Sequence, residues 1–366
     1  MIVGIPKEIK IKENRVSMVI AGVRSLKKNG HQVIVQHRAG EGVGISDQDY
    51  INAGAKVLEK AEEVYEQADM IVKVKEPLPE EYALLKEGQI LYTYLHLAAD
   101  ERLTKALLER NIVGIAYETI QDPDGSLPLL APMSAVAGRM ATQIGATYLQ
   151  HDHGGKGALL GGVTGVERSK VVILGGGAVG VNAAKMAVGL GAEVTILDVN
   201  VARMEYLSDI FGNEVSTLYS NNEQIEKTVS RADLVIGAIL VPGAKAPKLV
   251  TREMVSTMDP GGVIVDVAVD QGGSVETSRP TSHEHPTYTV DGVIHYAVPN
   301  MPGAVPKTST YALTNVTMGY ASMIANLGWK EAIEKDAALK KGVNVLNGKV
   351  TYKQVANDLG LPYQEI

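Results

Sequence analysis

The sequence predicts an α/β protein, and two features of the 366-residue chain carry that prediction. Short apolar runs alternate with helix-compatible segments along most of its length, which indicates parallel βαβ units. A glycine-rich turn lies near the middle of the chain, between an apolar run and a helical segment. Because a chain of this length usually forms more than one domain, we expect two Rossmann-like domains with a cleft between them, joined by long helices.

Composition excludes several classes of function. The net charge is −7, so no basic excess offsets phosphate repulsion and we expect no nucleic-acid partner. The chain has no cysteine, which rules out disulfides, thiolate nucleophiles and cysteine metal sites. Charge appears too early in the N-terminal MIVGIPKEIK for a signal peptide, so we expect a cytoplasmic protein with no membrane partner.

The first 128 residues contain alternating strands and helices but no glycine fingerprint, so we expect them to form the substrate domain. Apolar runs predict strands at Ile2 to Ile5, His31 to Gln36, Met70 to Val74, Gln89 to Leu95 and Ile112 to Ala116. The segments between them predict helices at Met18 to Asn29, Ala61 to Gln67, Pro79 to Lys86 and Asp100 to Arg110.

Three polar residues of this half are candidates for substrate contact. Lys75 and His96 each follow a predicted strand, and open parallel sheets bind ligands outside the carboxyl ends of their strands. The alternatives are a solvated loop lysine and an ordinary loop histidine. Arg15 precedes the first helix; it is a surface residue unless it faces the cleft, where its fork would suit a carboxylate.

Prolines and glycines after residue 122 predict a crossing between domains. We assign residues 129–306 to an NAD-binding Rossmann domain and residues 1–128 and 307–366 to a discontinuous substrate (catalytic) domain. A long helix from Ser309 to Leu327 would lead back to the first domain. The residues after it look helical, with Thr351 as a cap.

The stretch Lys170 to Asp198 matches the dinucleotide-binding fingerprint: a strand, a G-x-G-x-x-G turn, a helix and a second strand ending on an acid. Gly175 allows the tight turn, Gly177 lets a pyrophosphate approach the backbone, and Gly180 allows close helix packing. Asp198 can accept hydrogen bonds from a ribose and repel a 2′-phosphate. These features predict NAD as the cofactor.

The second half continues the alternation beyond this fingerprint. A strand is expected at Val263 to Val269, with Asp266 inside it and Asp270 at its end, and a hairpin at Tyr288 to Val298. Its end position favours Asp270 as the acid that faces the cleft, whereas Asp266 would satisfy backbone groups.

No metal is expected, because the neighbouring glycines favour a polar loop over a metal site at His151, Asp152 and His153. A nicotinamide cofactor, a histidine proton acceptor and two cations together predict an NAD-dependent dehydrogenase. Its substrate would be a small 2-amino or 2-hydroxy acid, and the residues themselves do not choose between the two.

Several motifs together resemble the alanine dehydrogenase family, essentially from end to end. They are MIVGIPKEIK with KENRV, EPLPEE, YLHLA, PMSAVAGRMA, LGGGAVG, DVAVDQGG and YAVPNMPGAVPKTSTYALTN. The resemblance implies an oxidoreductase of L-alanine catabolism that converts L-alanine, water and NAD to pyruvate, ammonium and NADH, usually as a homohexamer. One departure is that Val19-Ile20 stands where the family usually has Thr-Pro at a helix start.

The resemblance also implies roles for individual residues. Arg15 would bind the substrate carboxylate, Lys75 would polarise the pyruvate carbonyl or bind the same carboxylate, and His96 would be the general acid/base. Asp270 would orient water or ammonia and share proton transfer. Beyond Gly175, Gly177 and Gly180, the implied cofactor contacts are Ser134, Ala178, Val179, Asp198, Arg203, Ser220, Ile239, Leu240, Val267, Asp270, Arg279, Val298, Asn300 and Met301.

The alternative function is a non-catalytic NAD(H)-binding module, like a soluble transhydrogenase subunit that presents its cofactor to a partner. Such a module has no need of Lys75, His96 and Asp270 at strand ends.

Overall fold

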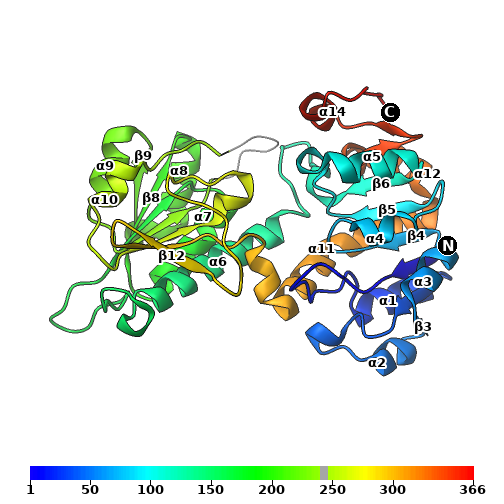
Figure 1. Cartoon of the computed structure of the whole chain (residues 1–366), viewed down its shortest axis with the longest axis horizontal. Helices are drawn as coiled ribbons and strands as arrows, with labels where there is room; N and C mark the ends of the chain where they lie inside the picture. The colour runs from blue at the N-terminus through cyan, green and yellow to red at the C-terminus, as the bar shows by residue number, and fades with distance from the viewer. Residues whose placement is uncertain (240–245) are drawn as a thin grey trace. The chain divides into compact units, whose positions relative to one another are not determined.

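The computed structural model describes residues 1–239 and 246–366, which form two compact units. The first unit combines Met1–Met133 with Val305–Ile366, and the second is Ser134–Ala304. Helix α6 (Ala131–Tyr148) begins in the first unit and continues in the second. Each unit has its own sheet flanked by helices (Figure 1), which confirms the α/β prediction.

The first unit's sheet has the strand order β15-β14-β6-β5-β4-β1-β2-β3. Its strands are β1 (Ile2–Ile5), β2 (Gln32–Gln36), β3 (Lys56–Leu58), β4 (Met70–Val72), β5 (Ile90–Thr93), β6 (Val113–Ala116), β14 (Val343–Leu346) and β15 (Lys349–Val350). Strands β1 to β6 pair in parallel, whereas β14 runs antiparallel to β6. The chain order reverses between β1 and β4, the point where doubly wound sheets bind ligands.

Helices cover this sheet and bury an apolar core against it. They are α1 (Ile20–Lys28), α2 (Asp47–Asn52), α3 (Ala61–Gln67), α4 (Pro79–Tyr82), α5 (Glu101–Glu109), α11 (Pro306–Leu327), α12 (Trp329–Lys335), α13 (Ala337–Gly342) and α14 (Lys353–Leu359). Helix α5 shows the pattern, because Leu103 and Leu107 are four residues apart and fully buried beside Leu91 of β5.

Helix α1 begins at Ile20, two residues later than predicted, and its N-cap residue Val19 makes no side-chain hydrogen bond. Tertiary contacts hold the approach to the helix instead. The backbone N–H of Val16 donates to the Thr310 hydroxyl at 3.2 Å, and the Tyr50 hydroxyl donates to the Met18 carbonyl at 2.8 Å. The loop that carries Arg15 is therefore fixed without a Thr-Pro cap.

The C-terminal residues are not all helical, so that prediction is wrong for β14 and β15. These strands form an antiparallel hairpin in which Leu346 pairs with Lys349. The turn residues Asn347 and Gly348 both have positive φ, as a two-residue hairpin requires, and Asn-Gly was the sequence signal for it. Thr351 caps no helix; its hydroxyl donates to the Val343 carbonyl.

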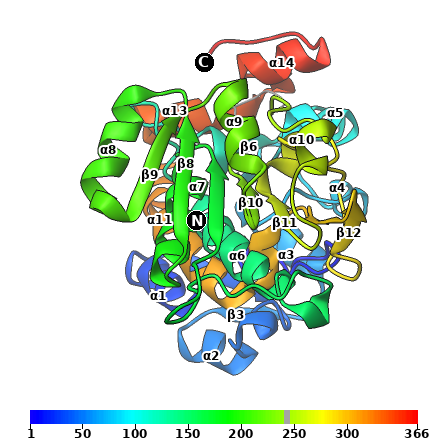
Figure 2. The same ribbon diagram turned by 90° about the vertical axis from the view of Figure 1, so that its left-hand side faces the viewer.

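The second unit's sheet has the order β12-β13-β11-β10-β7-β8-β9. Its strands are β7 (Lys170–Leu174), β8 (Glu193–Asp198), β9 (Val215–Tyr219), β10 (Leu234–Gly237), β11 (Val263–Asp266), β12 (Thr287–Val290) and β13 (Val293–Tyr296), and its helices after α6 are α7 (Ala178–Gly189), α8 (Val201–Phe211), α9 (Asn222–Val229) and α10 (Arg252–Ser256). Figure 2 shows β9 and β8 side by side, with α8 beyond β9. The order reverses between β7 and β10, so this sheet too has a switch point.

Two details of this unit bear on the sequence predictions. The hairpin is confirmed, because β12 and β13 join through Asp291 and Gly292, both at positive φ. The strand expected at Val263 to Val269 ends earlier, at Asp266, and a 3-10 helix (Val267–Gln271) follows it. In the described parts of the chain, no helix is both long enough and apolar enough to cross a membrane.

Candidate active site

The carboxyl edge of the first sheet brings together the loops that hold the three predicted substrate residues. Arg15 lies in the loop after β1, Lys75 follows β4 and His96 follows β5. Because β1, β4 and β5 are adjacent and parallel, these loops leave the sheet at neighbouring positions beside its switch point.

His96 is held by carboxylates on both its ring and its backbone. Its Nδ1 lies 3.3 Å from Oε2 of Glu76, and its backbone N–H donates to Oε1 of Glu118 at 2.6 Å. Glu118 also accepts from the backbone N–H of Leu95. This support matters because His96 has φ of 50°, a left-handed conformation that is uncommon outside glycine and clusters at functional sites.

Glu76 is a carboxylate that contacts both Lys10 and His96. Oε1 pairs with Lys10, Oε2 faces His96, and the charge of the adjacent Lys75 also acts on it. Partial burial raises the pKa of Glu76, but hydrogen bonds from His96 and Lys10 and the charges of Lys75 and His96 together hold it well below its usual range. Glu76 is therefore ionised at neutral pH.

The backbone of Lys75 is fixed from two sides. Its N–H lies 3.4 Å from Oε1 of Glu8, and its carbonyl accepts from the buried Thr93 hydroxyl at 3.0 Å. Glu8 also accepts from the N–H of Val74 at 2.6 Å. The side chain of Lys75 therefore leaves the strand end from a rigid backbone.

A buried ion cluster lies beneath this position. Lys73 is fully buried, with Nζ 2.9 Å from Oε1 of Glu81 and 3.2 Å from Oε2 of Glu8. Burial lowers the pKa of Lys73, but the two carboxylates outweigh that effect and raise it above its ordinary value. The Tyr65 hydroxyl donates to Glu81 at 2.8 Å, which completes the cluster. It links the loop after β1 to the loop after β4.

Arg15 is buried, with 2% of its surface exposed, and so is not the surface arginine of the alternative interpretation. Its Nε and Nη2 donate to the two oxygens of Glu13, and Nη1 lies 3.3 Å from Sδ of Met133. Burial lowers the pKa of Arg15, but Glu13 raises it, so the guanidinium stays charged. Glu13 therefore occupies the edge of the guanidinium that Nε and Nη2 form.

Tyr94 lies close to His96 and feels the charge of Arg15. Its ring centroid is 5.7 Å from that of His96, and its hydroxyl donates to the Leu129 carbonyl at 2.6 Å. Burial raises the pKa of Tyr94, and the nearby charge of Arg15 only partly offsets this, so the phenol stays neutral. The Tyr94 side chain therefore packs at the carboxyl edge of the first sheet without adding charge there.

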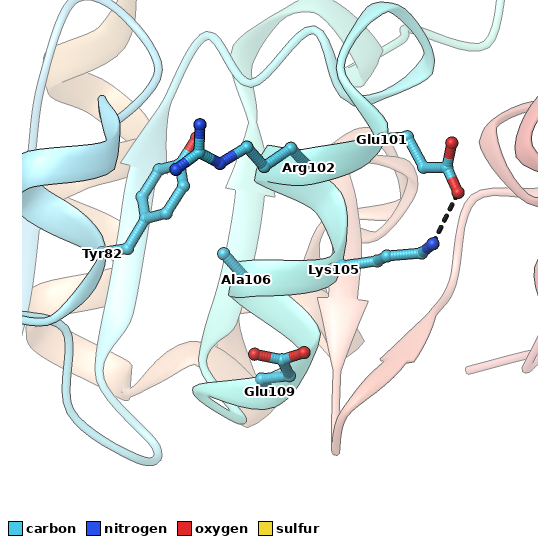
Figure 3. A pocket seen from close by; sticks show the side chains of 6 residues that line it. All are labelled: Tyr82, Glu101, Arg102, Lys105, Ala106 and Glu109. Atoms are coloured by element: carbon cyan, nitrogen blue, oxygen red, sulfur yellow. Dashed lines mark ion pairs between the residues drawn. The ribbon is translucent and has the colours of Figure 1, made fainter.

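A pocket of about 470 Å³ runs along helix α5 (Figure 3). It is lined by Tyr82, Glu101, Arg102, Lys105, Ala106 and Glu109. Lys105 pairs with Glu101 at 2.6 Å, and Arg102 extends toward the Tyr82 ring. None of the predicted site residues lines this pocket. Of its charged residues, Lys105 and Glu101 neutralise each other.

The second unit carries the glycine turn where the sequence predicted it. Gly175 has φ of 102°, and a methyl group on Gly180 would lie 1.9 Å from the Gly175 carbonyl oxygen, so both positions require glycine. A methyl group on Gly177 would meet nothing within 4 Å. The backbone there faces open space at the start of the 12-residue helix α7, which fits a pyrophosphate ligand.

Asp198 ends β8 and supports the glycine turn. Its Oδ2 accepts from the Gly176 N–H at 2.7 Å and its Oδ1 from the Asn200 N–H at 2.8 Å. Arg203 completes this support, because its Nε donates to the Gly176 carbonyl at 2.6 Å. The acid therefore has a structural role that the sequence did not indicate.

Most other predicted cofactor residues follow the carboxyl ends of strands in this unit: Ser220 after β9, Ile239 after β10, Val267 after β11, and Val298, Asn300 and Met301 after β13. Ala178 and Val179 open α7, and Ser134 lies one turn before Gly138, where α6 contacts that helix. Arg279 stacks on Tyr288 of β12 at 4.2 Å. Val298 and Met301 are buried, and Leu240 lies outside the described residues.

The two candidate acids after β11 have different environments. Asp266 is buried and accepts from the backbone N–H groups of Ala268, Ser274 and Val275, as expected for a structural acid. Asp270 is exposed on the 3-10 helix, and Asn300 donates its backbone N–H to it at 3.4 Å. The described residues contain no group of three or more metal-binding side chains close enough to hold an ion.

Comparison with known proteins decides the family. The family described as "Alanine dehydrogenase/PNT, N-terminal domain" matches residues 4–137, and its C-terminal counterpart matches residues 141–353. The chain belongs to the alanine dehydrogenase/PNT family. An alanine dehydrogenase of Methanococcus maripaludis is 61% identical over 99% of this chain and 98% of its own length.

Solved structures of the alanine dehydrogenase/PNT family distinguish its two branches. A structure titled L-alanine dehydrogenase matches with a TM-score of 0.95 and 54% identity, covering 98% of this chain and 99% of its own. A transhydrogenase from Sinorhizobium meliloti matches with a TM-score of 0.82 and 26% identity, covering 96% and 99%. The chain is more similar to the dehydrogenase branch by both measures.

Proposed function

We propose that this chain is an NAD-dependent L-alanine dehydrogenase, which oxidatively deaminates L-alanine to pyruvate and ammonium and also catalyses the reverse reaction. The observation that carries the proposal is the placement of Lys75 and His96 on neighbouring strand ends, where both act on Glu76. Full-length identity to alanine dehydrogenases supports the choice of an amino acid over a hydroxy acid. We further propose that it works in the cytoplasm as a homohexamer, as the family resemblance implies.

The residues of the edge suit distinct roles in this reaction. Arg15 would bind the substrate carboxylate, since a charged, rigidly held guanidinium favours that geometry. Lys75 would polarise the carbonyl of pyruvate, and His96 would move the proton between substrate and solvent. We propose that Asp270 is the acid that orients water or ammonia. Activity measurements on Asp270 variants test this role.

The second unit would hold NAD, which supplies the hydride acceptor when bound. The open face of Gly177 suits the pyrophosphate, and the carboxylate of Asp198 suits the adenosine ribose. The remaining contacts would come from Ser134, Gly175, Ala178, Val179, Gly180, Arg203, Ser220, Ile239, Leu240, Val267, Asp270, Arg279, Val298, Asn300 and Met301.

Ammonium should be required for the reverse reaction. With pyruvate and NADH, we expect NADH oxidation only when ammonium is present, because the carbinolamine and imine cannot form without it. The rate of absorbance loss with and without ammonium measures this. Equal rates in both samples would indicate a hydroxy-acid dehydrogenase instead.

Asp198 should set the preference for NAD over NADP. Asp198→Ala removes the ribose acceptor and the charge that repels a 2′-phosphate, so the kcat/KM ratio of NAD to NADP should fall roughly 10- to 100-fold, as expected for a lost charge-assisted hydrogen bond. The ratio separates this effect from loosening of the Gly176 turn, which would weaken the binding of both cofactors. An unchanged ratio would contradict the ribose role.

The alternative is a soluble module of a transhydrogenase-like complex, since the chain also has a fold similarity, although a weaker one, to a transhydrogenase. Such a module would bind NAD(H) but would not oxidise alanine by itself. It would also not require the strained His96 or its two carboxylate partners.

A further inference from the structure

Glu76 has no assigned role in the proposed reaction, although it contacts His96. It directly follows Lys75 in the loop after β4, whereas His96 lies after the neighbouring strand β5. The side chain of Glu76 is 14% exposed and that of His96 is 42% exposed, so the imidazole is accessible while its carboxylate partner is largely covered.

The hydrogen bond between them fixes which ring nitrogen can accept a proton. An ionised carboxylate only accepts hydrogen bonds, so Nδ1 of His96 must carry a hydrogen to bond Oε2 of Glu76 at 3.3 Å. In the neutral ring, Nε2 then has the lone pair. A general base in this tautomer takes a substrate proton on Nε2 while the bond to Glu76 stays intact.

The second oxygen of Glu76 has a different partner. Oε1 pairs with Lys10, from the loop after β1, in an ion pair that is partly exposed on the lysine side. Lys10 is 39% exposed and pairs with the oxygen of Glu76 that does not face His96, which makes it a useful comparison. Lys75 is the other group through which Glu76 could act, because its charge bears on the same carboxylate.

We propose that Glu76 is a positioning residue that holds His96 in the Nδ1-protonated tautomer, with Nε2 directed to the substrate. This rests on the proposed alanine dehydrogenase function. Glu76→Gln keeps the size of the side chain but can present an amide N–H to Nδ1, which stabilises the wrong tautomer. We expect kcat for alanine oxidation to fall roughly 10- to 100-fold, the effect typical of outer-shell groups that orient a functional imidazole, with the KM for NAD unchanged.

A double-mutant cycle tests the proposal. Glu76→Gln, His96→Gln and the double variant are assayed for alanine oxidation, with active-site concentration taken from NADH titration. If Glu76 acts through His96, Glu76→Gln causes no further loss once His96 is replaced. If the two losses multiply, Glu76 acts through Lys75 or through folding, and the proposal is overturned.

Lys10→Met is the matched control, because it removes the other partner of the same carboxylate. We expect a change in kcat of less than about threefold, in line with a partly exposed ion pair. A loss as large as that of Glu76→Gln would assign the effect to the whole ion cluster and overturn the proposal. Wild-type turnover of alanine is measured in the same series, so failure of the proposed function itself would be seen separately.

Discussion

Replacing His96 with alanine should lower kcat for alanine oxidation by roughly 10²- to 10⁴-fold, the usual contribution of a positioned general acid/base. The physical reason is that the substrate proton would lose its acceptor at the edge of the first sheet. NADH affinity should stay the same, because the glycine turn is in the other unit. Steady-state turnover and NADH fluorescence titration of the same preparation measure the two effects.

His37 provides a matched control for that variant. It also follows a strand of the first sheet, its side chain is also 42% exposed, and its Nδ1 also pairs with a carboxylate, Asp47. His37→Ala should therefore turn over alanine at close to the wild-type rate. Wild-type activity in His96→Ala, or an equal loss in both variants, would contradict the role of His96.

Alanine substitutions at two glycines of the turn should have different effects on thermal stability and NADH affinity. In Gly180→Ala the new methyl group would lie 1.9 Å from the Gly175 carbonyl oxygen, so the turn and α7 must separate. Such overpacking costs about 1–3 kcal/mol, and both thermal stability and NADH affinity should fall.

Gly177→Ala is the paired variant. Its φ of −68° suits alanine and its methyl group meets no atom within 4 Å, so the Tm should stay near the wild-type value. The same methyl group would occupy the space of the pyrophosphate, and NADH affinity should fall roughly tenfold, or about 1.4 kcal/mol. Calorimetry and fluorescence titration distinguish the variants, and a Gly177→Ala protein that binds NADH normally would contradict this location of the cofactor.

The sequence predicted best what depends on local chemistry. The glycine turn, the acid after the second strand and the Asp291-Gly292 hairpin all rest on residues within a few positions of each other. Lys75 and His96 were also placed at the correct edge, because the carboxyl ends of parallel strands must meet there.

The contacts that the sequence did not predict depend on how segments distant in the sequence pack together. Glu76 and Glu118 contact His96 but lie 20 and 22 residues from it in the sequence, and no spacing rule predicts either contact. The Glu13–Arg15 pair is local, but its burial follows from how the loop after β1 packs. The β14–β15 hairpin was missed although Asn347-Gly348 marks it, because the flanking runs are short and the segment lies among helices.

The most direct test of the central claim is the absorbance of NADH when the purified chain is mixed with L-alanine and NAD and no other protein. Steady formation of NADH, with pyruvate in equal amount, is the result that the proposed alanine dehydrogenase predicts. NADH binding without turnover would contradict it and would instead favour a cofactor-presenting module.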